Sequence, residues 1–351
     1  MSPQLDEQTL PPPVQVSRMM VSQWMSEAIR AAAELGIGNA LAARPMCSGE
    51  LAAELSTDLD ATYRLMMALV ALDLAEVHDG RFELTEAGRC LDSSSPSSCH
   101  AWVRLIGSGL PAQGWGALPE CVRTGQMASK LQDGRPDSDT ALWDELDANP
   151  EAAETFHRAM YEITRDSAPP IAQALDLDDA GRVADVGGGA GGLLCAVLDA
   201  HPHVDGVVFD LENARGSANK LLTERGHAQR GRFEGGSFFD TPLPPADVYM
   251  MKNVIHDWDD EHALRILENC RATMPEHARL MIVEAPLPEE RSNSFFDWFM
   301  AFADLNVLVN NGGRERTQAQ YEELLTKAGF VPVAVHDAQL FSVFEARLGG
   351  S

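Results

Sequence analysis

A glycine-rich segment at residues 182–192, RVADVGGGAGG, constrains the fold of this chain more than any other feature. A short apolar run leads to Asp185, glycine fills five of the six positions from 187 to 192, and a helix-compatible apolar segment follows at Leu193–Ala200. Glycine adopts positive φ without a steric penalty and lets the backbone approach a ligand closely. The first turn of a helix offers free N–H groups to a polar or negative ligand. The segment therefore predicts a strand, a tight turn and a helix that bind a nucleotide-like cofactor.

Strand and helix patterns alternate from about residue 175 onward, which predicts an open, mostly parallel α/β sheet of the Rossmann-like type. Helices are expected between the strands at Leu193–Ala200, Ala214–Arg225 and Glu261–Met274. The last two strands are separated by only a few residues, and so short a connection makes them antiparallel. The seven expected strands are Arg182–Val186, Gly206–Asp210, Arg232–Gly235, Asp247–Lys252, Leu280–Glu284, Val331–His336 and Leu340–Arg347.

The N-terminal part has the pattern of a winged helix-turn-helix. Residues 1 to about 14 are polar and are expected to form a flexible tail. Apolar residues then recur at helical spacing from Ser17 to Ala43, and two further helices are predicted at Leu51–Leu55 and Ala61–Leu72. Alternating apolar and polar residues flank Asp79-Gly80, which predicts a β-hairpin. Helix, helix, helix and hairpin make a mostly α-helical domain.

Charge and composition argue against nucleic acid as the partner of this domain. The formal net charge is −26 at pH 7, and such a field repels phosphate backbones. The helix that would enter a DNA groove, ATYRLMMALVAL, carries one cation, Arg64, whereas groove recognition needs donors for base edges and cations for phosphates. Its apolar residues Met66, Met67, Leu69 and Val70 form a surplus that needs a partner, so we expect the domain to serve dimerisation.

A helical region connects the two patterned parts. Helices are expected from His100 to about Asp147, with a loop at Gln132–Asp139, and again at Glu151–Arg165. Three residues, Phe156, Met160 and Thr164, share one face of that last helix. Such a stripe is typical of core packing, but here the helix leads directly into the glycine-rich domain and can also form a wall of the ligand site. The expected domains are 15–98 (winged helix), 99–174 (helical, lining the substrate) and 175–351 (cofactor binding).

The glycine turn alone leaves two cofactors open. GGGAGG matches the G-x-G-x-x-G fingerprint of dinucleotide sites and also the looser pattern of S-adenosylmethionine (SAM) sites. Asp210, at the end of the next strand, suits ribose hydroxyls in either case. Three features favour SAM: GGSFFD at residues 235–240, where an adenine would be held, the terminal antiparallel hairpin, and the stretch MMKNVIHDWDDEHALRILENC at residues 250–270.

With these motifs the chain resembles the SAM-dependent small-molecule O-methyltransferases of the plant caffeate type and their bacterial natural-product relatives. The similarity is carried by DVGGGAG, FDLE, GGSFF, MKNVIHDWDDEHALRILENC and GGRERT, the last followed by YEELLTKAGF. It covers nearly the whole chain, because the family also has an N-terminal winged-helix dimerisation domain. The resemblance implies a class I methyltransferase fold with a seven-stranded sheet and a homodimer. It also implies SAM as the cofactor, no metal, and an aromatic small molecule as acceptor.

The resemblance also implies roles for individual residues. His256 is the expected general base, and Glu284 and Glu315 are the expected acids beside it. Ser237 stands where the plant enzymes usually carry an aspartate near the adenine, and Asn306 where they tend to have an apolar pocket residue. The expected cofactor-binding residues are Asp185, Gly187, Gly189, Asp210, Leu211, Gly236, Ser237, Phe238, Lys252 and Asn253, and the expected substrate-lining residues are Phe156, Met160, Asp257, Trp298, Phe302, Asn306 and Asn310.

The chemistry of methyl transfer to a hydroxyl agrees with a histidine at this place. A phenol has a pKa of about 10, like tyrosine, and needs help to lose its proton at neutral pH. A histidine, with an unperturbed pKa of about 6.5, can take that proton, and a neighbouring carboxylate orients the ring and stabilises the imidazolium. His256 lies just past the fourth strand, at the edge where open α/β sheets bind ligands. We therefore expect methylation of a phenolic hydroxyl in secondary metabolism.

Some residues admit a second interpretation. The four acids Asp257, Asp259, Asp260 and Glu261 have the chemistry of a metal site, but they precede a helix whose N-terminus they can cap, so no metal is expected. Glu315 can pair with Arg314 or Arg316 instead of a histidine. The buried polar residues Asp304 and Asn306 need partners, which are either a substrate or other side chains.

Other functions also stay open at this stage. Enzymes of the same fold can methylate nitrogen or carry out SAM-assisted hydroxylation or decarboxylation, although a neutral amine needs no base. An NAD-dependent oxidoreductase and a ligand-sensing winged-helix regulator are further alternatives. Six scattered cysteines without a C-x-x-C pair are typical of reduced thiols. With no signal-peptide pattern and no apolar run of membrane-spanning length, we expect a cytoplasmic protein.

Overall fold

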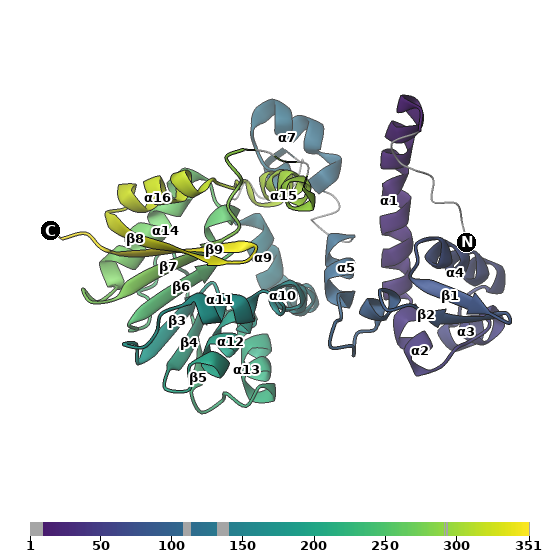
Figure 1. Cartoon of the computed structure of the whole chain (residues 1–351), viewed down its shortest axis with the longest axis horizontal. Coiled ribbons are helices and arrows are strands. Elements are labelled where there is room, and N and C mark those ends of the chain that lie inside the picture. Colours follow the sequence, from purple (N-terminus) through teal and green to yellow (C-terminus); the bar gives the residue numbers. More distant parts are fainter. Residues whose placement is uncertain (1–9, 108–113, 132–139, 291, 293, 351) are drawn as a thin grey trace. The chain divides into compact units, whose positions relative to one another are not determined.

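The computed structural model describes residues 10–107, 114–131, 140–290, 292 and 294–350. The chain forms two compact units, Met1–Ser108 and Gly109–Ser351 (Figure 1). The loop expected at 132–139 and the first nine residues of the expected tail lie outside the described residues. Across the described ranges, no helix combines the length and the apolar character that crossing a membrane requires.

The first unit contains the predicted helices and hairpin. The helical tract predicted from Ser17 to Ala43 is two helices, because Gly36 has φ of 76° and ends the first one. The tail is shorter than expected: the first helix begins at Pro12, since proline suits a first turn where no N–H partner exists. The elements are α1 (Pro12–Glu34), α2 (Ile37–Ala43), α3 (Ser48–Leu55), α4 (Leu59–Ala71), β1 (Ala75–His78), β2 (Arg81–Leu84), the 3₁₀ turn η2 (Gly88–Leu91) and α5 (His100–Ile106).

The exposed apolar surface of this unit lies mainly on α1 and not on α4. Met66 and Leu69, expected to need an external partner, are both 0% exposed inside the unit's own core. Met67 is 39% exposed, so only part of the predicted surplus on α4 is at the surface. The apolar side chains that α1 exposes most are Val16, Met19, Met20 and Trp24, at 60–73%.

One sheet of seven strands organises the second unit, as predicted, in the order β5-β4-β3-β6-β7-β9-β8. The first five of these strands are parallel to one another, and β9 runs antiparallel to both β7 and β8. The strands are β3 (Arg182–Val186), β4 (Asp205–Asp210), β5 (Gly231–Gly235), β6 (Val248–Lys252), β7 (Arg279–Glu284), β8 (Phe330–Ala338) and β9 (Phe341–Leu348).

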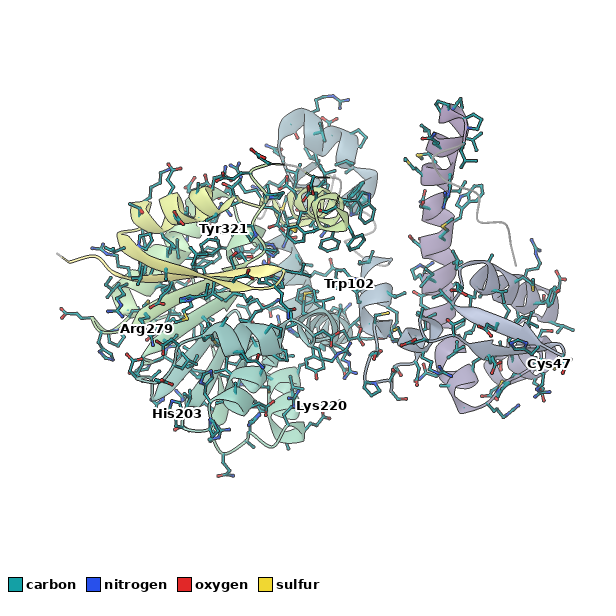
Figure 2. The ribbon with its side chains drawn as sticks, in the orientation of Figure 1. Cys47, Trp102, His203, Lys220, Arg279 and Tyr321 are labelled. Carbon is teal, nitrogen blue, oxygen red and sulfur yellow. The ribbon has the colours of Figure 1, made fainter. Side chains whose placement is uncertain are left out.

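Helices cover both faces of this sheet (Figure 1). Side chains of α11 (Ala168–Ala174), α12 (Gly192–Ala200) and α13 (Arg215–Glu224) pack on one face, and those of α14 (Asp260–Thr273) and α16 (Gln318–Lys327) on the other. On that second face, the ring of Tyr321 (labelled in Figure 2) packs at a tilt against the ring of Phe344 of β9, with 5.0 Å between ring centroids. Alternate strand residues serve the two cores because strand side chains point to opposite faces in turn.

The remaining elements surround the carboxyl edge of the sheet, where the parallel strands end and where open α/β sheets bind ligands. Helix α10 (Pro150–Thr164) contacts α12 and α13. The other elements of this unit are α7 (Leu118–Thr124), α8 (Ala128–Leu131), α9 (Ala141–Ala148), α15 (Phe295–Asn311) and the 3₁₀ turns η3 (Glu212–Ala214) and η4 (Ile255–Asp257).

Candidate active site

The glycine turn after β3 needs glycine for two separate reasons. Gly187, Gly189 and Gly191 all have positive φ, between 54° and 81°, a conformation that glycine adopts at no steric cost. A Cβ on Gly187 would also lie 2.7 Å from the Cγ2 atom of Val254, so the space beside the turn is closed to a side chain.

Asp185 joins the end of β3 to the helix that follows it. Its carboxylate accepts a hydrogen bond of 3.2 Å from the backbone N–H of Leu194, in the first turn of α12. The side chain is fully enclosed, and burial raises the pKa of Asp185 to about 7. Asp185 therefore fixes the direction in which the helix leaves the turn.

Asp210, at the end of β4, is oriented by two backbone donors. Its Oδ2 atom accepts from the N–H of Gly189 at 2.7 Å and its Oδ1 atom from the N–H of Leu211 at 2.6 Å. Burial raises the pKa of the Asp210 carboxyl, and the bond from Gly189 opposes that rise. Each oxygen keeps further acceptor capacity, so the carboxylate is held ready to receive hydroxyl groups of a ligand.

Aromatic side chains form a corner beyond the end of β5. Phe238 lies 5.1 Å from Phe239 and 6.0 Å from Trp258 between ring centroids. The amide of Asn269 donates to the backbone oxygen of Phe238 at 2.9 Å and fixes this loop. Ser237 uses its hydroxyl locally, because the Oγ atom accepts from the N–H of Phe239 at 3.2 Å.

Lys252, at the end of β6, is a half-buried cation. Its Nζ atom donates to the hydroxyl of Thr164 at 3.4 Å and lies 4.5 Å above the ring of Phe341. Burial lowers the pKa of Lys252 to about 8, although the charges of Glu284 and Asp185 act in the opposite direction.

A single cavity brings the predicted cofactor residues together. It is lined by all ten of the residues predicted to bind the cofactor, which come from the ends of β3, β4, β5 and β6. Three predicted substrate-lining residues, Phe156, Met160 and Asp257, line it as well. Because Thr164 also does so, the stripe on α10 is a wall of the cavity.

His256 belongs to η4 and lies among three carboxylates. Its Nδ1 atom is 2.9 Å from Oε1 of Glu315 and 3.9 Å from Oε2 of Glu284, and its Nε2 atom is 3.6 Å from Oδ1 of Asp257. Glu284 accepts hydrogen bonds from the backbone N–H groups of Ile255 and His256, at 3.0 and 3.3 Å, and so holds η4 to the end of β7. Nδ1 is thus the hydrogen-bonded ring nitrogen, and Nε2 has no hydrogen-bond partner among the described residues.

The charges of this cluster strongly favour a protonated histidine. Burial by itself lowers the pKa of His256, but the carboxylates of Glu284, Glu315 and Asp257 outweigh it and raise the pKa to about 10. Burial raises the pKa of Glu284 to about 7 and that of Asp257 to about 6. The second oxygens of Glu284 and Glu315 have no hydrogen-bond partner in the described part of the chain.

The segment that carries Glu315 is fixed by its neighbours. The side chain of Arg316 is 1% exposed and donates to the carbonyl oxygens of Ile255 and Trp258, at 3.0 and 2.9 Å, and to the carboxylate of Asp260. The partner of Arg316 is thus Asp260, and Glu315 pairs with the histidine. Asp304 accepts from the N–H of Glu315 at 2.9 Å, so an internal hydrogen bond satisfies this acid.

Comparison with known proteins places the chain in a family. A family model described as an O-methyltransferase domain matches residues 115–331, and a model described as an O-methyltransferase dimerisation domain matches residues 17–94. The chain belongs to the O-methyltransferase family. Its N-terminal unit therefore contains this family's dimerisation domain.

The similar proteins include both O-methyltransferases and an N-methyltransferase. The O-demethylpuromycin-O-methyltransferase of Streptomyces alboniger is 40% identical over 308 residues, which are 87% of this chain and 80% of that protein. An 8-amino-8-demethylriboflavin N,N-dimethyltransferase of Streptomyces davaonensis is 33% identical over 324 residues, 90% of each chain. The crystal structure of an O-methyltransferase from neocarzinostatin biosynthesis, in complex with SAM and 2-hydroxy-5-methyl naphthoic acid, matches with a TM-score of 0.76 and 30% identity over 92% of this chain and 95% of that one.

The enzyme is a SAM-dependent O-methyltransferase of the class I fold. The cavity fits this cofactor: a turn without side chains, a carboxylate with free acceptor capacity and an aromatic corner lie around one space. These are the groups that a nucleoside with a charged amino-acid arm requires.

The four acids at the start of α14 in this methyltransferase do not act together. Asp259 caps the helix, because its carboxylate accepts from the N–H of His262 at 2.9 Å. Asp260 pairs with Arg316, and Asp257 accepts from the amide of Asn311 at 2.8 Å. Asp259 is thus the N-cap, and Asp260 and Glu261 lie in the first turn of α14, where acids complement the helix dipole. Asp257 belongs to the histidine cluster.

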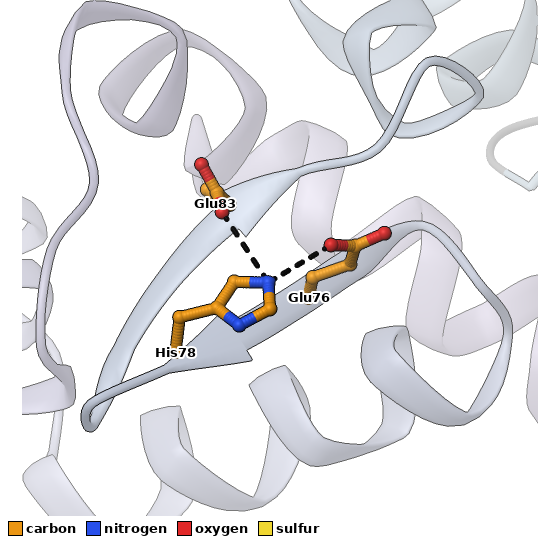
Figure 3. A group of neighbouring side chains, drawn as sticks. All are labelled: Glu76, His78 and Glu83. Carbon is orange, nitrogen blue, oxygen red and sulfur yellow. Dashed lines mark hydrogen bonds and ion pairs between the residues drawn. The ribbon is translucent and has the colours of Figure 1, made fainter. Parts of the chain in front are cut away.

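Among the described residues, one group of three side chains has the spacing of metal ligands, and it lies on the hairpin of the N-terminal unit (Figure 3). The Nε2 atom of His78 is 3.0 Å from Glu76 and 3.5 Å from Glu83. The hydrogen bond to Glu76 raises the pKa of His78. Because Glu76 and Glu83 are directly opposite each other across the hairpin, a protonated His78 offsets the repulsion of two facing carboxylates.

Four predicted substrate-lining residues, all on α15, do not line the cavity described above. Trp298 and Phe302 are 57% and 47% exposed, with 5.1 Å between their ring centroids. Asn306 accepts hydrogen bonds from the indole of Trp115 at 3.1 Å and from the amide of Asn310 at 2.9 Å. The oxygen of Asn306 is therefore already satisfied within the protein.

Sequence reasoning missed residues that act through close packing. Gly313 lies against η4, where a Cβ would be 2.1 Å from the backbone oxygen of His256 and 2.4 Å from the carbonyl carbon of Asp257. His157 lines the cavity with 3% exposure. Gly313 belongs to the GGRERT motif, but the motif does not show its contact with η4, and no motif marks His157. Both residues meet segments far apart in the sequence.

Replacing Gly313 by alanine should displace η4, because the obstructing atoms belong to the backbone and cannot rotate away. We expect kcat to fall by about 10²-fold, the effect of a displacement near 1 Å, while the Kd of S-adenosylhomocysteine measured by calorimetry stays unchanged. Gly116→Ala is the matched control, since a Cβ there meets no atom within 4 Å. A wild-type kcat in Gly313→Ala would show that this contact does not position the histidine.

Proposed function

We propose that this O-methyltransferase transfers the methyl group of SAM to a phenolic hydroxyl of an aromatic small molecule in natural-product biosynthesis, with His256 as the general base. The observation that carries the proposal is the 2.9 Å contact of Nδ1 with Glu315, which leaves Nε2 for the acceptor. Asp257, the next residue, lines the cofactor cavity. The puromycin relative and the naphthoic acid complex support an aromatic acceptor.

We infer the cofactor's placement from the same cavity. The glycine turn would hold the methionine end, Asp210 the ribose hydroxyls, and the corner of Phe238 and Trp258 the adenine. Lys252, hydrogen-bonded to Thr164, would face the cofactor from the end of β6. When bound, SAM supplies an electrophilic methyl group, and the protein's own task is to hold the acceptor oxygen in line with it.

His256 would remove the proton of the acceptor hydroxyl at Nε2. Glu315 fixes the ring by accepting the Nδ1–H, and Glu284 holds the backbone of the same turn. The buried carboxylates then stabilise the imidazolium that forms, as in other histidine–carboxylate pairs. After the methyl group has been transferred, His256 returns the proton on Nε2 to solvent, either directly or once the product has left.

The second candidate is methyl transfer to nitrogen, which the N,N-dimethyltransferase relative favours. A neutral amine is already nucleophilic and needs no base. The three carboxylates around His256 would then have no catalytic purpose, so the cluster favours the hydroxyl.

We also propose that four residues of α15 contact the molecule that accepts the methyl group. These residues are Trp298, Phe302, Asn306 and Asn310.

Replacing His256 by alanine should separate the two candidates. With matched phenol and aniline acceptors, we expect turnover of the phenol to fall by roughly 10²–10⁴-fold and the affinity for S-adenosylhomocysteine to stay the same. Steady-state kinetics and calorimetry give the two quantities. If the aniline is the better acceptor and its turnover survives His256→Ala, the enzyme is an N-methyltransferase. Near wild-type turnover of the phenol would remove His256 from the role of base.

The pH dependence of kcat/KM follows from the raised pKa of His256. A pKa of about 10 means that the resting cluster holds a proton which the productive form must lack, so kcat/KM should rise between pH 6 and 9 by up to tenfold per unit. The pH at which it levels off reports the apparent pKa of the cluster. Glu315→Gln removes one of the raising charges, so its plateau should begin at a lower pH. Ionisation of the free phenol cannot produce that shift, and an unshifted plateau would contradict the assignment.

We also propose that the enzyme is a homodimer formed through its N-terminal unit. The match to a dimerisation domain and the exposed apolar side chains of α1 support this. Trp24→Glu, at a position 73% exposed, should convert a particle of twice the chain's mass into one of the chain's own mass in light scattering. Arg64→Glu, on the exposed side of α4, is the control for a change of charge alone. A wild-type particle of single-chain mass would exclude the dimer.

A further inference from the structure

His157 is a buried imidazole that the reaction described above does not use. It lies on α10, is 3% exposed and lines the cofactor cavity. Its Nε2 atom is 2.8 Å from the amide oxygen of Asn213, in the 3₁₀ turn that follows Asp210. Its Nδ1 atom is buried and has no hydrogen-bond partner among the described residues. A buried polar atom without a hydrogen-bond partner lowers the free energy of unfolding, and a ligand that forms the missing hydrogen bond removes this cost.

The neighbours of His157 determine which ring nitrogen carries the hydrogen. The amide of Asn213 lies between His157 and the exposed carboxylate of Asp147, with its nitrogen 2.5 Å from Asp147. A carboxylate only accepts, so the NH₂ group of Asn213 must face Asp147 and its oxygen must face His157. That oxygen in turn only accepts, so Nε2 carries the hydrogen. The Nδ1 atom of the neutral ring is then a hydrogen-bond acceptor.

This acceptor faces the glycine turn. A Cβ on Gly189 would stand 3.7 Å from the Nδ1 atom of His157, and the N–H of the same glycine donates to Asp210. Nδ1 and the Asp210 carboxylate are therefore two acceptors beside one residue of the cavity wall. A ligand with two adjacent hydroxyl groups offers two donors and matches this pair.

We propose that Nδ1 of His157 accepts a hydrogen bond from a ribose hydroxyl of the cofactor, in a relay that runs from Asp147 through Asn213 to His157. The proposal rests on the assignment of Asp210 to the ribose made above. It adds to that assignment a second acceptor, and it gives the exposed residue Asp147 a role in positioning the amide that orients the imidazole.

Two substitutions of His157 distinguish the role of its Nδ1 atom from that of its Nε2 atom. Asparagine reproduces an acceptor near the position of Nδ1 but does not reach Asn213, whereas glutamine places a donor near Nε2 and has no acceptor at the Nδ1 position. We expect His157→Gln to weaken binding of S-adenosylhomocysteine by about tenfold, the effect of an unpaired buried hydroxyl, and His157→Asn to retain most of the affinity. The measurement is the Kd by calorimetry, with the melting temperature of the ligand-free protein as a check of folding.

Deoxy analogues of the ligand make the test specific. The wild type should bind S-adenosylhomocysteine more tightly than its 2′-deoxy and 3′-deoxy forms, and the penalty of His157→Gln should disappear for one of the two. A penalty of equal size for all three ligands, or none for any, would overturn the role of His157. A wild type that binds all three ligands equally would instead show that the ribose is not held at Asp210, which is a separate failure of the placement proposed above.

Discussion

The second unit depends on carboxylates at the carboxyl ends of parallel strands that are held by backbone N–H groups. Asp185 joins the end of β3 to the first turn of α12, Asp210 joins β4 to the glycine turn of the neighbouring β3, and Glu284 joins β7 to the turn after the neighbouring β6. Burial alone would favour neutral acids, and it raises the pKa of all three. The backbone donors offset part of that cost. Each acid thereby fixes a loop that hydrogen bonds between strands cannot reach.

This arrangement places the cofactor cavity and the histidine cluster at the same edge of the sheet. The cofactor cavity is built at β3, β4, β5 and β6, whereas the histidine cluster is built at η4 and the end of β7. Lys252, at the end of β6, stands between them, and its pKa responds to Glu284 on one side and Asp185 on the other. Its positive charge therefore lies between two groups of acids, and a change in either group alters the electrostatic field in the other.

The sequence predicts the sheet and most of the cavity because both follow from local patterns. Alternating strand and helix segments determine the five parallel strands, and parallel strands bring their carboxyl ends to one edge, so Gly187, Asp210 and Lys252 had to meet there. Local pattern alone does not show which acid pairs with which base, and only the resemblance implied that Glu315 lies beside His256. Glu315 stands between two arginines, and only the fold reveals that Arg316 is taken by Asp260 and the carbonyl groups of η4. The prediction that the apolar residues on α4 need an external partner was wrong for Met66 and Leu69. Helical spacing cannot distinguish a core within one unit from a contact with another chain.

His157 and His256 illustrate why residue type alone could not assign these sites. The ring of His256 faces three carboxylates, and their charges favour the imidazolium, which suits a group that must stabilise a proton once it has taken one. The ring of His157 faces an amide oxygen instead, and the amide is oriented by a carboxylate one step further away. The amide of Asn213 orients the hydrogen bond to His157, and it keeps the charged carboxylate of Asp147 out of contact with the ring. We therefore propose the same side chain as a base in one case and as a hydrogen-bond acceptor in the other. The difference lies in residues more than fifty positions away in the sequence, namely Asn213 for His157 and Glu315 for His256.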